Sequence, residues 1–491
     1  MPTRSCIWLT IVVVIPTVLA WYLSETVVNL GNVACGFAAK TVCSGVFVSE
    51  RNPESVFQHD LPGLVKRLVQ YKVDYDGQYV NTSIWPNVFS SSAVYHGPYT
   101  GCSVIANRQL YESTHRAQYD LLDGVQSGAA PHVTLESEDI VQYNATIQDI
   151  VSAEFTRESY ERAHTRAIAV LYDGKLVAEG YASSEHLPGI GAQTPLLGWS
   201  MTKTLTAILV GMRVRQGHMT LDQVVYGNAT LREVIQMTNV LASIREDYSD
   251  TATIPTLLFT QPSIVEFIHS YVAAETAKPD HATPQSGADA WYYSSALTNI
   301  LSHALRRSFA TDIEYWRFPK EALFGIVGAN SVVMETDQSG LFVGSSFSYA
   351  TARDWARLGH LLVQRGQWNG KQLLDESYVN LMWQRAPGSA GVYGGHVWCV
   401  PTSPLYSHAS LYVRSKRVLL DRVLQATPPS DTCLMIGHHG QYVIMIPSRH
   451  LVLVRLGLTE GMVPPKDPAR WDDWHPTWDI SRFLQSVLDA I

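Results

Sequence analysis

The sequence lacks several features that mark particular classes of protein. It has no run of Lys or Arg and a formal net charge of −8, so it offers no broad electrostatic footprint for nucleic acid. It has no His-Glu-x-x-His and no Cys-x-x-Cys motif, which argues against the common zinc sites. Six cysteines in 491 residues are too few for a disulfide-built miniprotein, and no internal repeat is present.

The composition is that of a folded protein with more than one structural unit. Hydrophobic residues make up 46% of the chain and charged residues 16%, which excludes a mostly disordered chain. A length of 491 residues favours two or three units, although one α/β enzyme domain with insertions also fits.

The N-terminus carries an apolar segment. Arg4 precedes an uncharged stretch over 5–24, and Glu25 follows it. The apolar core, Cys6 to Leu23, is just long enough to span a bilayer, which favours an uncleaved anchor. Val18-Leu19-Ala20 resembles a cleavage site, so a signal peptide is the main alternative, and a buried helix is a third. The flanking charges favour a chain whose body lies outside the cytoplasm.

Two weaker patterns agree with secretion or a membrane-anchored, non-cytoplasmic location. Three glycosylation sequons begin at Asn81, Asn144 and Asn228. Cys43 and Cys102 flank a β-rich stretch, and Cys399 and Cys433 lie in two segments that read as strands. In an oxidising compartment each pair could form a disulfide, and otherwise these residues would be small buried hydrophobes.

Hydrophobic periodicity predicts the elements. Helical spacing appears at 27–43 and 61–73, and short strands are expected within 80–104. From 167 to 181 two strands flank Asp173-Gly174, a hairpin signal that implies an antiparallel sheet. Further helices are expected at 200–216, 296–305, 354–364 and 480–491, with a mostly helical region over 218–310 and strands at 432–436, 441–446 and 451–455.

Strands at both ends with helices between them imply that the early and late strands share one sheet. The predicted fold is therefore α/β of the α+β kind: an antiparallel sheet flanked by helices, plus a helical subdomain. We divide the chain into the anchor or signal peptide (1–24), a region that packs on the main domain (25–150) and the main domain itself (151–491), which carries the chemical motifs.

The strongest chemical motif is Ser200-Met201-Thr202-Lys203 at the start of the apolar helix. Ser200 and Lys203 lie one turn apart on the same helix face. A serine hydroxyl needs a base to become a nucleophile, and a lysine can serve when burial and nearby cations lower its pKa. The helix N-terminus favours a developing negative charge at Ser200. In the non-catalytic alternative, Ser200 is only the helix N-cap and Lys203 extends its charged end towards water.

Two other segments carry candidate groups. Tyr293, in Trp291-Tyr292-Tyr293-Ser294-Ser295, could pass a proton to a leaving group, although alone it would read as a packed aromatic turn. His438-His439-Gly440-Gln441 opens a late strand, and Gly437 and Gly440 would let a substrate approach the strand edge. Adjacent histidines on a strand face opposite ways, so a shared metal is not expected.

In this order the three motifs resemble those of the serine β-lactamase and penicillin-binding-protein superfamily. The form is similar to the class C β-lactamase-like serine hydrolases, in the branch of the 6-aminohexanoate-dimer hydrolases. The resembling stretches are 198–203, 346–359 and 440–456, with a weaker likeness over 35–51.

The resemblance implies roles residue by residue. Ser200 would be the nucleophile, Lys203 its base and Tyr293 the proton shuttle. The backbone N–H groups of Ser200 and Gln441 would form the oxyanion hole. Ser295 stands where the family has Asn. His438, His439 and Gly440 stand where it has Lys-Thr-Gly. Loss of that Lys weakens the case for β-lactam and peptidoglycan-peptide substrates.

We therefore expect a serine hydrolase acting through an acyl-serine intermediate on an amide, ester or short peptide, without metal or cofactor. A catalytically idle scaffold or assembly protein is the rival, and an intact Ser200, Lys203 and Tyr293 argues against it. A conventional α/β-hydrolase is disfavoured because Thr202 stands where its elbow needs Gly. No oligomeric state follows from the sequence.

Overall fold

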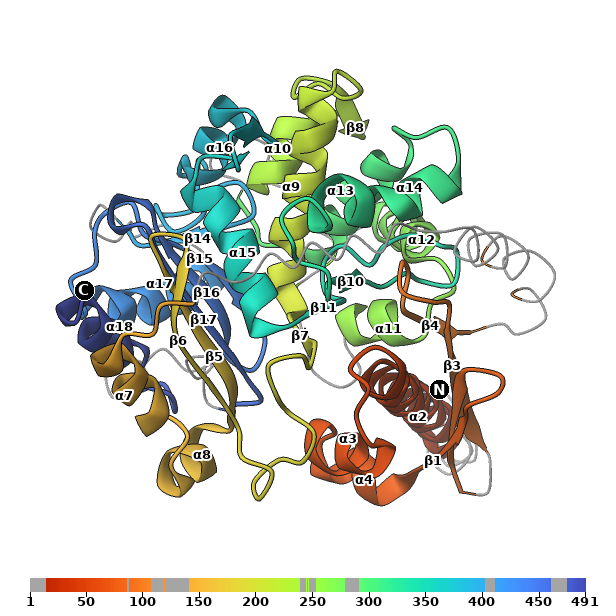
Figure 1. Ribbon diagram of the computed structural model, residues 1–491. Helices are drawn as coiled ribbons and strands as arrows, with labels where there is room; N and C mark the ends of the chain where they lie inside the picture. The colour runs from red at the N-terminus through yellow and green to blue at the C-terminus, as the bar shows by residue number, and fades with distance from the viewer. Residues whose placement is uncertain are drawn as a thin grey trace, which may run out of the picture.

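The computed structural model describes residues 15–85, 88–106, 111, 119, 141–238, 244, 246, 253–278, 291–401, 411–460 and 475–491. Arg4 and the first part of the predicted anchor or signal peptide lie outside these residues. The chain forms a mixed α/β fold with antiparallel sheets, as predicted (Figure 1).

The largest sheet joins strands from both ends of the hydrolase region. Its order is β14-β15-β16-β17-β5-β6, and every neighbouring pair is antiparallel. The strands are β14 (Trp398–Cys399), β15 (Cys433–Gly437), β16 (Gln441–Ile446), β17 (Leu451–Gly457), β5 (Thr165–Tyr172) and β6 (Lys175–Tyr181). All residues of β15, β16 and β17 are buried, which explains their near-continuous apolar sequence. The predicted pairing of early and late strands is confirmed.

Helices cover both faces of this sheet (Figure 1). On one face lies α15 (Ala352–Val363), which approaches closely because a side chain at Gly359 would meet Val443 and Val452 at 2.8 Å. On the other face lie α7 (Ala145–Ala153), α17 (Leu411–Leu424) and α18 (Ile480–Asp489). The sheet is therefore shielded from water on both sides.

The helical part follows the first hairpin. Its buried centre is α9 (Thr202–Arg215), which packs against α13 (Ser295–Arg306). Ser294 caps α13 by accepting a hydrogen bond from the Leu297 N–H. The surrounding elements are α10 (Leu231–Gln236), α11 (Thr253–Phe259), α12 (Ile264–Thr276), α14 (Asp312–Phe318), α16 (Glu376–Trp383), β7 (Leu196–Leu197), β10 (Val333–Met334) and β11 (Ser348–Ala350). The short helix α8 (Arg157–Ala163) precedes the hairpin and leads into β5.

The N-terminal part is a helix packed on a second antiparallel sheet. The helix is α2 (Ile15–Phe47), and the sheet runs β1 (Val69–Asp74), β2 (Tyr79–Ile84), β3 (Phe89–Tyr95), β4 (Cys102–Ile105). Thr26–Phe47 is long and apolar enough to cross a membrane, but 67% of its most apolar window is buried inside the body. This half of α2 is thus a core helix here.

One predicted helix is wrong beyond its first half. The spacing over 61–73 predicts a continuous helix, yet α4 (Gly63–Leu68) ends where β1 begins. Within β1, Val69, Tyr71 and Val73 alternate with polar residues, and all six residues pair with β2. The period-two pattern over this short stretch was hidden by the apolar residues shared with the preceding helix.

Both predicted disulfides are present. Cys43 of α2 is bonded to Cys102 of β4, and Cys399 of β14 is bonded to Cys433 of β15. The first bond ties the long helix to its own sheet. The second closes the β14–β15 edge, one residue from Trp398, which packs against Tyr293.

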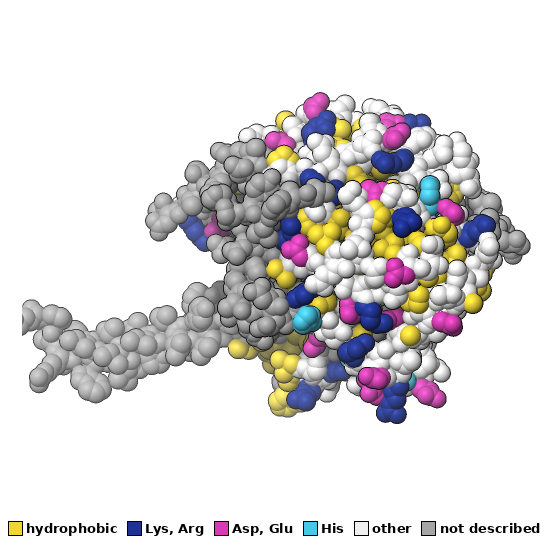
Figure 2. Space-filling model, turned by 90° about the vertical axis from the view of Figure 1, so that its left-hand side faces the viewer, with side chains coloured by type: hydrophobic (Ala, Val, Ile, Leu, Met, Phe, Trp, Pro, Cys, Tyr) yellow, Lys and Arg dark blue, Asp and Glu magenta, His cyan; other side chains and the backbone are white. Residues whose placement is uncertain are grey.

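The face of the molecule in Figure 2 carries Lys and Arg side chains interspersed with Asp and Glu, with hydrophobic side chains between them. Charge of one sign does not dominate this face, in keeping with the small net charge.

Candidate active site

Ser200 lies where a tight turn enters the buried helix. A 3-10 turn, Trp199–Met201, runs directly into α9, and Trp199 has a positive φ of 49°. The turn packs against β15 and β16. A side chain at Gly437 would meet the Gly198 carbonyl at 2.2 Å, so glycine there admits the protein's own backbone. We expected Gly437 to admit a substrate, and the close approach of Gly198 corrects that expectation.

Lys203 is 1% exposed and its ammonium has three neighbouring oxygens. Nζ lies 3.2 Å from the Ser200 Oγ, 3.0 Å from the Ser295 Oγ and 2.8 Å from the Ser345 carbonyl oxygen. Nζ also lies 4.9 Å from the centre of the Tyr293 ring. The structure therefore brings Ser200, Lys203, Tyr293 and Ser295 together.

A buried carboxylate that sequence reasoning missed orients this group. Ser295 donates its hydroxyl proton to Glu246 Oε1 at 2.5 Å, and its backbone N–H bonds to Glu246 Oε2 at 2.8 Å. A serine hydroxyl has one proton, so the Ser295 oxygen is left to accept from Lys203. No motif marks Glu246 in the sequence, because it reaches the site from a separate segment.

Tyr293 is held as a neutral phenol. Burial raises its pKa, and the negative charge of Glu246 raises it further, while a hydrogen bond with the Ser200 side chain acts the other way. Its ring packs against Trp398 at 5.2 Å and Tyr393 at 5.8 Å. A neutral, fixed phenol beside Ser200 can donate or relay a proton.

His396 lies buried behind Lys203. Its Nδ1 is 2.6 Å from the Ile235 carbonyl oxygen and its Nε2 is 3.0 Å from the Thr298 hydroxyl. Burial lowers its pKa to about 3, and the charge of Lys203 acts in the same direction. The imidazole is therefore neutral, with its proton on the nitrogen that faces the carbonyl.

The two predicted histidines do not sit on opposite strand faces. His438, His439 and Gly440 form the turn between β15 and β16, with positive φ of 58° at His439 and 78° at Gly440. The rings of His438 and His439 lie 3.8 Å apart, and Trp199 meets the His438 ring edge-on at 5.6 Å. The alternation rule fails here because the pair lies in a turn.

Burial lowers the pKa of His439 well below its usual value, with smaller contributions from the charges of His438 and Arg166. His438 is exposed. The His438 side chain is therefore open to solvent, whereas the His439 ring lies in a largely desolvated environment.

The side chain of Gln441 holds this turn. Nε2 donates to the His438 carbonyl at 2.9 Å and to the Gly457 carbonyl at 2.5 Å, while Oε1 accepts from the Gly457 N–H at 2.9 Å. The side-chain amide of Gln441 is thus fully used in hydrogen bonds within the protein. The backbone N–H is therefore the group of Gln441 that could face a substrate.

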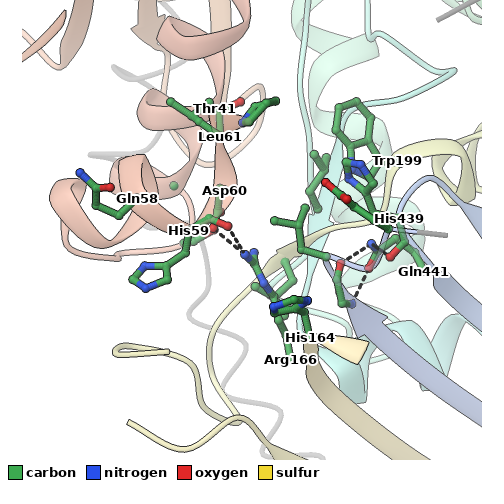
Figure 3. Close-up of a pocket in the computed structure, with 18 of the residues that line it drawn as sticks. Thr41, Gln58, His59, Asp60, Leu61, His164, Arg166, Trp199, His439 and Gln441 are labelled. Carbon is green, nitrogen blue, oxygen red and sulfur yellow. Dashed lines mark hydrogen bonds and ion pairs between the residues drawn. The ribbon is translucent and has the colours of Figure 1, made fainter. Parts of the chain in front are cut away.

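A cavity of about 730 Å³ adjoins the site, between the N-terminal part and the main sheet. Trp199, His439 and Gln441 lie together on one side of it, while Arg166 points across to Asp60 (Figure 3). Arg51 binds the same carboxylate, so the cavity contains a partly buried Arg-Asp-Arg group. Ser200 is not part of the lining, whereas its neighbour Trp199 is.

The three sequons differ in accessibility. Asn81 accepts a hydrogen bond from Ser92 and Asn144 caps α7, and both are half-buried. Asn228 is exposed. Among the described residues no group of three His, Cys, Asp or Glu side chains is arranged to hold a metal ion.

Comparisons place the chain among known folds. A family model described as Beta-lactamase matches residues 154–474. No protein of curated function matches the sequence. A protein assigned as a 6-aminohexanoate-dimer hydrolase from Bacillus anthracis is similar at 17% identity and a TM-score of 0.49, covering 72% of this chain and 87% of that one.

Two further solved structures are similar at this level. A penicillin-binding protein homolog from Caulobacter crescentus shows 14% identity and a TM-score of 0.47, over 71% of this chain and 97% of that one. A β-lactamase from Sulfitobacter sp. EE-36 shows 15% identity and a TM-score of 0.46, over 70% and 97%.

Proposed function

The chain belongs to the Beta-lactamase family, and from this premise we propose that it is a serine hydrolase that cleaves an amide or ester bond through an acyl-serine intermediate. Family membership supports serine-hydrolase activity in general. The observation that carries the specific proposal is the contact between Lys203 and the Ser200 hydroxyl at 3.2 Å, at the start of a buried helix.

The hydrogen bonds around Lys203 suit it to act as a base. A neutral amine has two N–H bonds, and Ser295 and the Ser345 carbonyl accept them. The lone pair then faces Ser200. Lys203 takes the hydroxyl proton as the Ser200 oxygen attacks the substrate carbonyl carbon, and the carbonyl oxygen becomes the anion of a tetrahedral intermediate.

The remaining steps use groups already in place. The backbone N–H groups of Ser200 and Gln441 would bind the oxyanion, and each such donor is worth about 3 kcal/mol in the transition state. The proton passes through Tyr293 to the leaving amine or alcohol, which leaves Ser200 acylated. A water molecule then attacks the acyl group, releasing the acid and restoring the Ser200 hydroxyl.

The direct test is covalent labelling with a fluorophosphonate probe followed by peptide mapping. The peptide containing Ser200 should carry the label, and Ser200→Ala should lose both label and esterase turnover with its melting temperature nearly unchanged. Ser184→Ala, at an exposed serine, is the matched control and should label normally. Absence of labelling in the folded wild type would favour the idle scaffold instead.

A second test separates the base from a structural lysine. Arg keeps the positive charge but does not give up its proton at working pH, so Lys203→Arg should be nearly inactive while still folded. Turnover close to that of the wild type would remove Lys203 from the mechanism.

Substrate preference is proposed from His438. Where the family has a Lys, which is cationic at neutral pH, this chain has an exposed histidine. A free imidazole is mostly neutral near pH 7.5. We expect uncharged esters and amides to be cleaved better than analogues ending in a carboxylate, by up to roughly a hundredfold. Penicillin-type substrates, which carry such a carboxylate, should be poor.

The measurement is the ratio of kcat/KM for a matched neutral and anionic pair. His438→Lys should shift this ratio towards the anionic substrate, whereas His218→Lys, which adds the same charge at an exposed remote position, should not. An unchanged ratio in His438→Lys would show that the side chain at position 438 does not affect the preference between neutral and anionic substrates.

We also propose that the body of the protein lies on the non-cytoplasmic side of a membrane, held by the segment before residue 25. The apolar run and the two disulfides support this location. The protein should pellet with membranes and resist carbonate extraction. Recovery of a soluble form beginning near Trp21 would identify a signal peptide instead.

A further inference from the structure

Six exposed hydrophobic side chains gather at one end of the N-terminal part. They account for six of the ten exposed large hydrophobic side chains among the described residues. Trp85 is 79% and Val88 66% exposed, the two highest values among these ten side chains. We call this set the apolar rim: Val27, Val28, Leu64, Leu68, Trp85 and Val88.

Strand register and packing place these residues together. Val69 pairs with Ile84 in the β1–β2 ladder, so Leu68 and Trp85 flank the same end of that ladder. Leu64 is one turn before Leu68 on α4. Ile84 pairs with Phe89, so Trp85 and Val88 both belong to the β2–β3 turn.

The long helix meets this turn near its N-terminal half. The Phe89 ring lies against Gly31, where a side chain would meet it at 2.5 Å. Val27 and Val28 are one turn before Gly31. The rim therefore surrounds the point where α2 leaves the body.

The same helix fixes how far the rim lies from a bilayer. α2 is unbroken from Ile15 to Phe47, so it runs from inside the apolar segment, Cys6 to Leu23, into the folded body. Leu23 and Val27 are four residues apart, about 6 Å along the axis. A head-group layer is about 6 Å deep on each side of the hydrocarbon core, so Val27 would lie within it.

We propose that the apolar rim is a second membrane contact, by which the body of the protein rests directly in the head-group layer of the non-cytoplasmic leaflet. The inference rests on the proposed anchor and adds a contact made by the folded part. Tryptophan at the tip of the rim suits this depth, because its amphipathic ring is enriched at membrane–water interfaces. Arg67 on α4 is exposed beside Leu68 and suits anionic head groups.

A bilayer explains this surface better than a soluble partner does. The rim rings a helix whose continuation is itself long enough to span a membrane, so any bound protein would compete with lipid for the same place. An unbroken helix also leaves no flexible linker that could lift the body away.

The test uses the full chain in vesicles of phosphatidylcholine and phosphatidylserine at four to one. In a Cys6→Ser background, Trp85→Cys or Leu68→Cys is labelled with an environment-sensitive fluorophore; Cys35 is buried, and four other cysteines are in disulfides. Tyr75→Cys is the matched control. It is exposed in the β1–β2 turn and packs near Phe47, about 24 Å along α2 from Gly31.

Labels at 68 and 85 should show blue-shifted emission and at least twofold quenching by nitroxide lipids, and the label at 75 should show neither. Equal water exposure at all three positions would overturn the rim, even if the vesicles retain the chain after carbonate extraction. Release of the chain by carbonate would defeat the anchor and the rim with it. A blue shift without lipid quenching would assign the surface to a second copy of the chain and also overturn the proposal.

Discussion

At the scale of single residues, the site depends on which way the Ser295 hydroxyl donates its proton. Ser295 gives its proton to Glu246, so its oxygen must accept from Lys203. The Ser345 carbonyl accepts a second N–H bond of the same amine. These two acceptors fix the orientation of the Lys203 amine relative to Ser200, without placing a carboxylate against the lysine as a direct ion pair.

This direction predicts that Glu246 is a positioning residue. Glu246→Gln could donate to Ser295 and let its hydroxyl turn towards Lys203, which would disturb one hydrogen bond of about 1.4 kcal/mol and lower kcat/KM roughly tenfold or more. The pH–rate profile should shift as well, a change that a merely structural role would not produce. Glu158→Gln, at an exposed glutamate, is the control and should leave both unchanged.

His396 gives a pH prediction at the same scale. Its pKa is lowered to about 3 by burial, below the usual value of 6.5. As the pH falls from 6.5 towards 3, the unfolded chain takes up a proton that the folded chain does not, so the free energy of unfolding falls by up to about 1.4 kcal/mol per pH unit.

His396→Gln removes this titration, so its unfolding free energy should depend less on pH over that range. Urea unfolding of both proteins at pH 7 and pH 5 measures the difference. Equal pH dependence in the two proteins would show that His396 is not neutral in the fold.

At the scale of elements, α2 supports the segment whose backbone binds Lys203. Lys40 of α2 pairs with buried Glu335, which also accepts from Ser44 at 2.7 Å. The Glu335 N–H bonds to the Phe347 carbonyl at 2.9 Å, and Lys40 lies 4.5 Å from the Phe347 ring. Ser345, whose carbonyl accepts from Lys203, lies two residues away on the same segment.

We therefore predict a strong penalty for breaking this pair. Burial lowers the pKa of Lys40, and the charge of Glu335 counters that effect. Lys40→Met leaves Glu335 buried without its cation and should lower the free energy of unfolding by about 3 kcal/mol or more. Denaturant unfolding should show that the double variant, Lys40→Met with Glu335→Gln, loses less than the two single variants together.

At the scale of the whole molecule, an Arg-Asp-Arg group joins the N-terminal part to the main sheet. Asp60 of α3 (Pro53–Asp60) binds Arg51 and also Arg166 of β5, across the cavity in Figure 3. Burial alone would raise the pKa of Asp60, but the charges of Arg166 and Arg51 outweigh it and lower the pKa. The folded chain thus favours the carboxylate more than the unfolded chain does.

The sign of this shift predicts acid sensitivity at the junction. The stabilisation is present above the ordinary pKa of about 3.8 and is lost as the pH falls through the lower folded value. Asp60→Asn should lower the free energy of unfolding by about 3 kcal/mol at pH 7, since it removes the carboxylate that both arginines bind.

Thermal unfolding across pH 7 to 2 tests this prediction. The gap between wild type and Asp60→Asn should narrow at the acid end, because the wild type has then lost the same interaction. A constant gap would mean that Asp60 is not ionised in the fold.

The helices and strands show how much of the secondary structure the hydrophobic pattern of the sequence predicts. The predicted strand 441–446 matches β16 at both ends, and the hairpin around Asp173-Gly174 appears as expected. By contrast, the helix predicted over 61–73 stops at Leu68, because pairing with β2 overrides a spacing that also suits a helix. Periodicity reports which residues are buried, and pairing decides the conformation in which they are buried.

The sequence by itself determined the fold class, two candidate disulfide pairs and three of the residues that meet around Lys203, namely Ser200, Tyr293 and Ser295, because apolar periodicity and short motifs are local properties of the chain. Only the tertiary structure decided that Glu246 orients Ser295, that the tilted rings of His438 and His439 lie together in a turn, and that Gly437 admits the Gly198 carbonyl. Each of these depends on contact between segments far apart in the chain or on a turn geometry. Neither spacing nor composition specifies them.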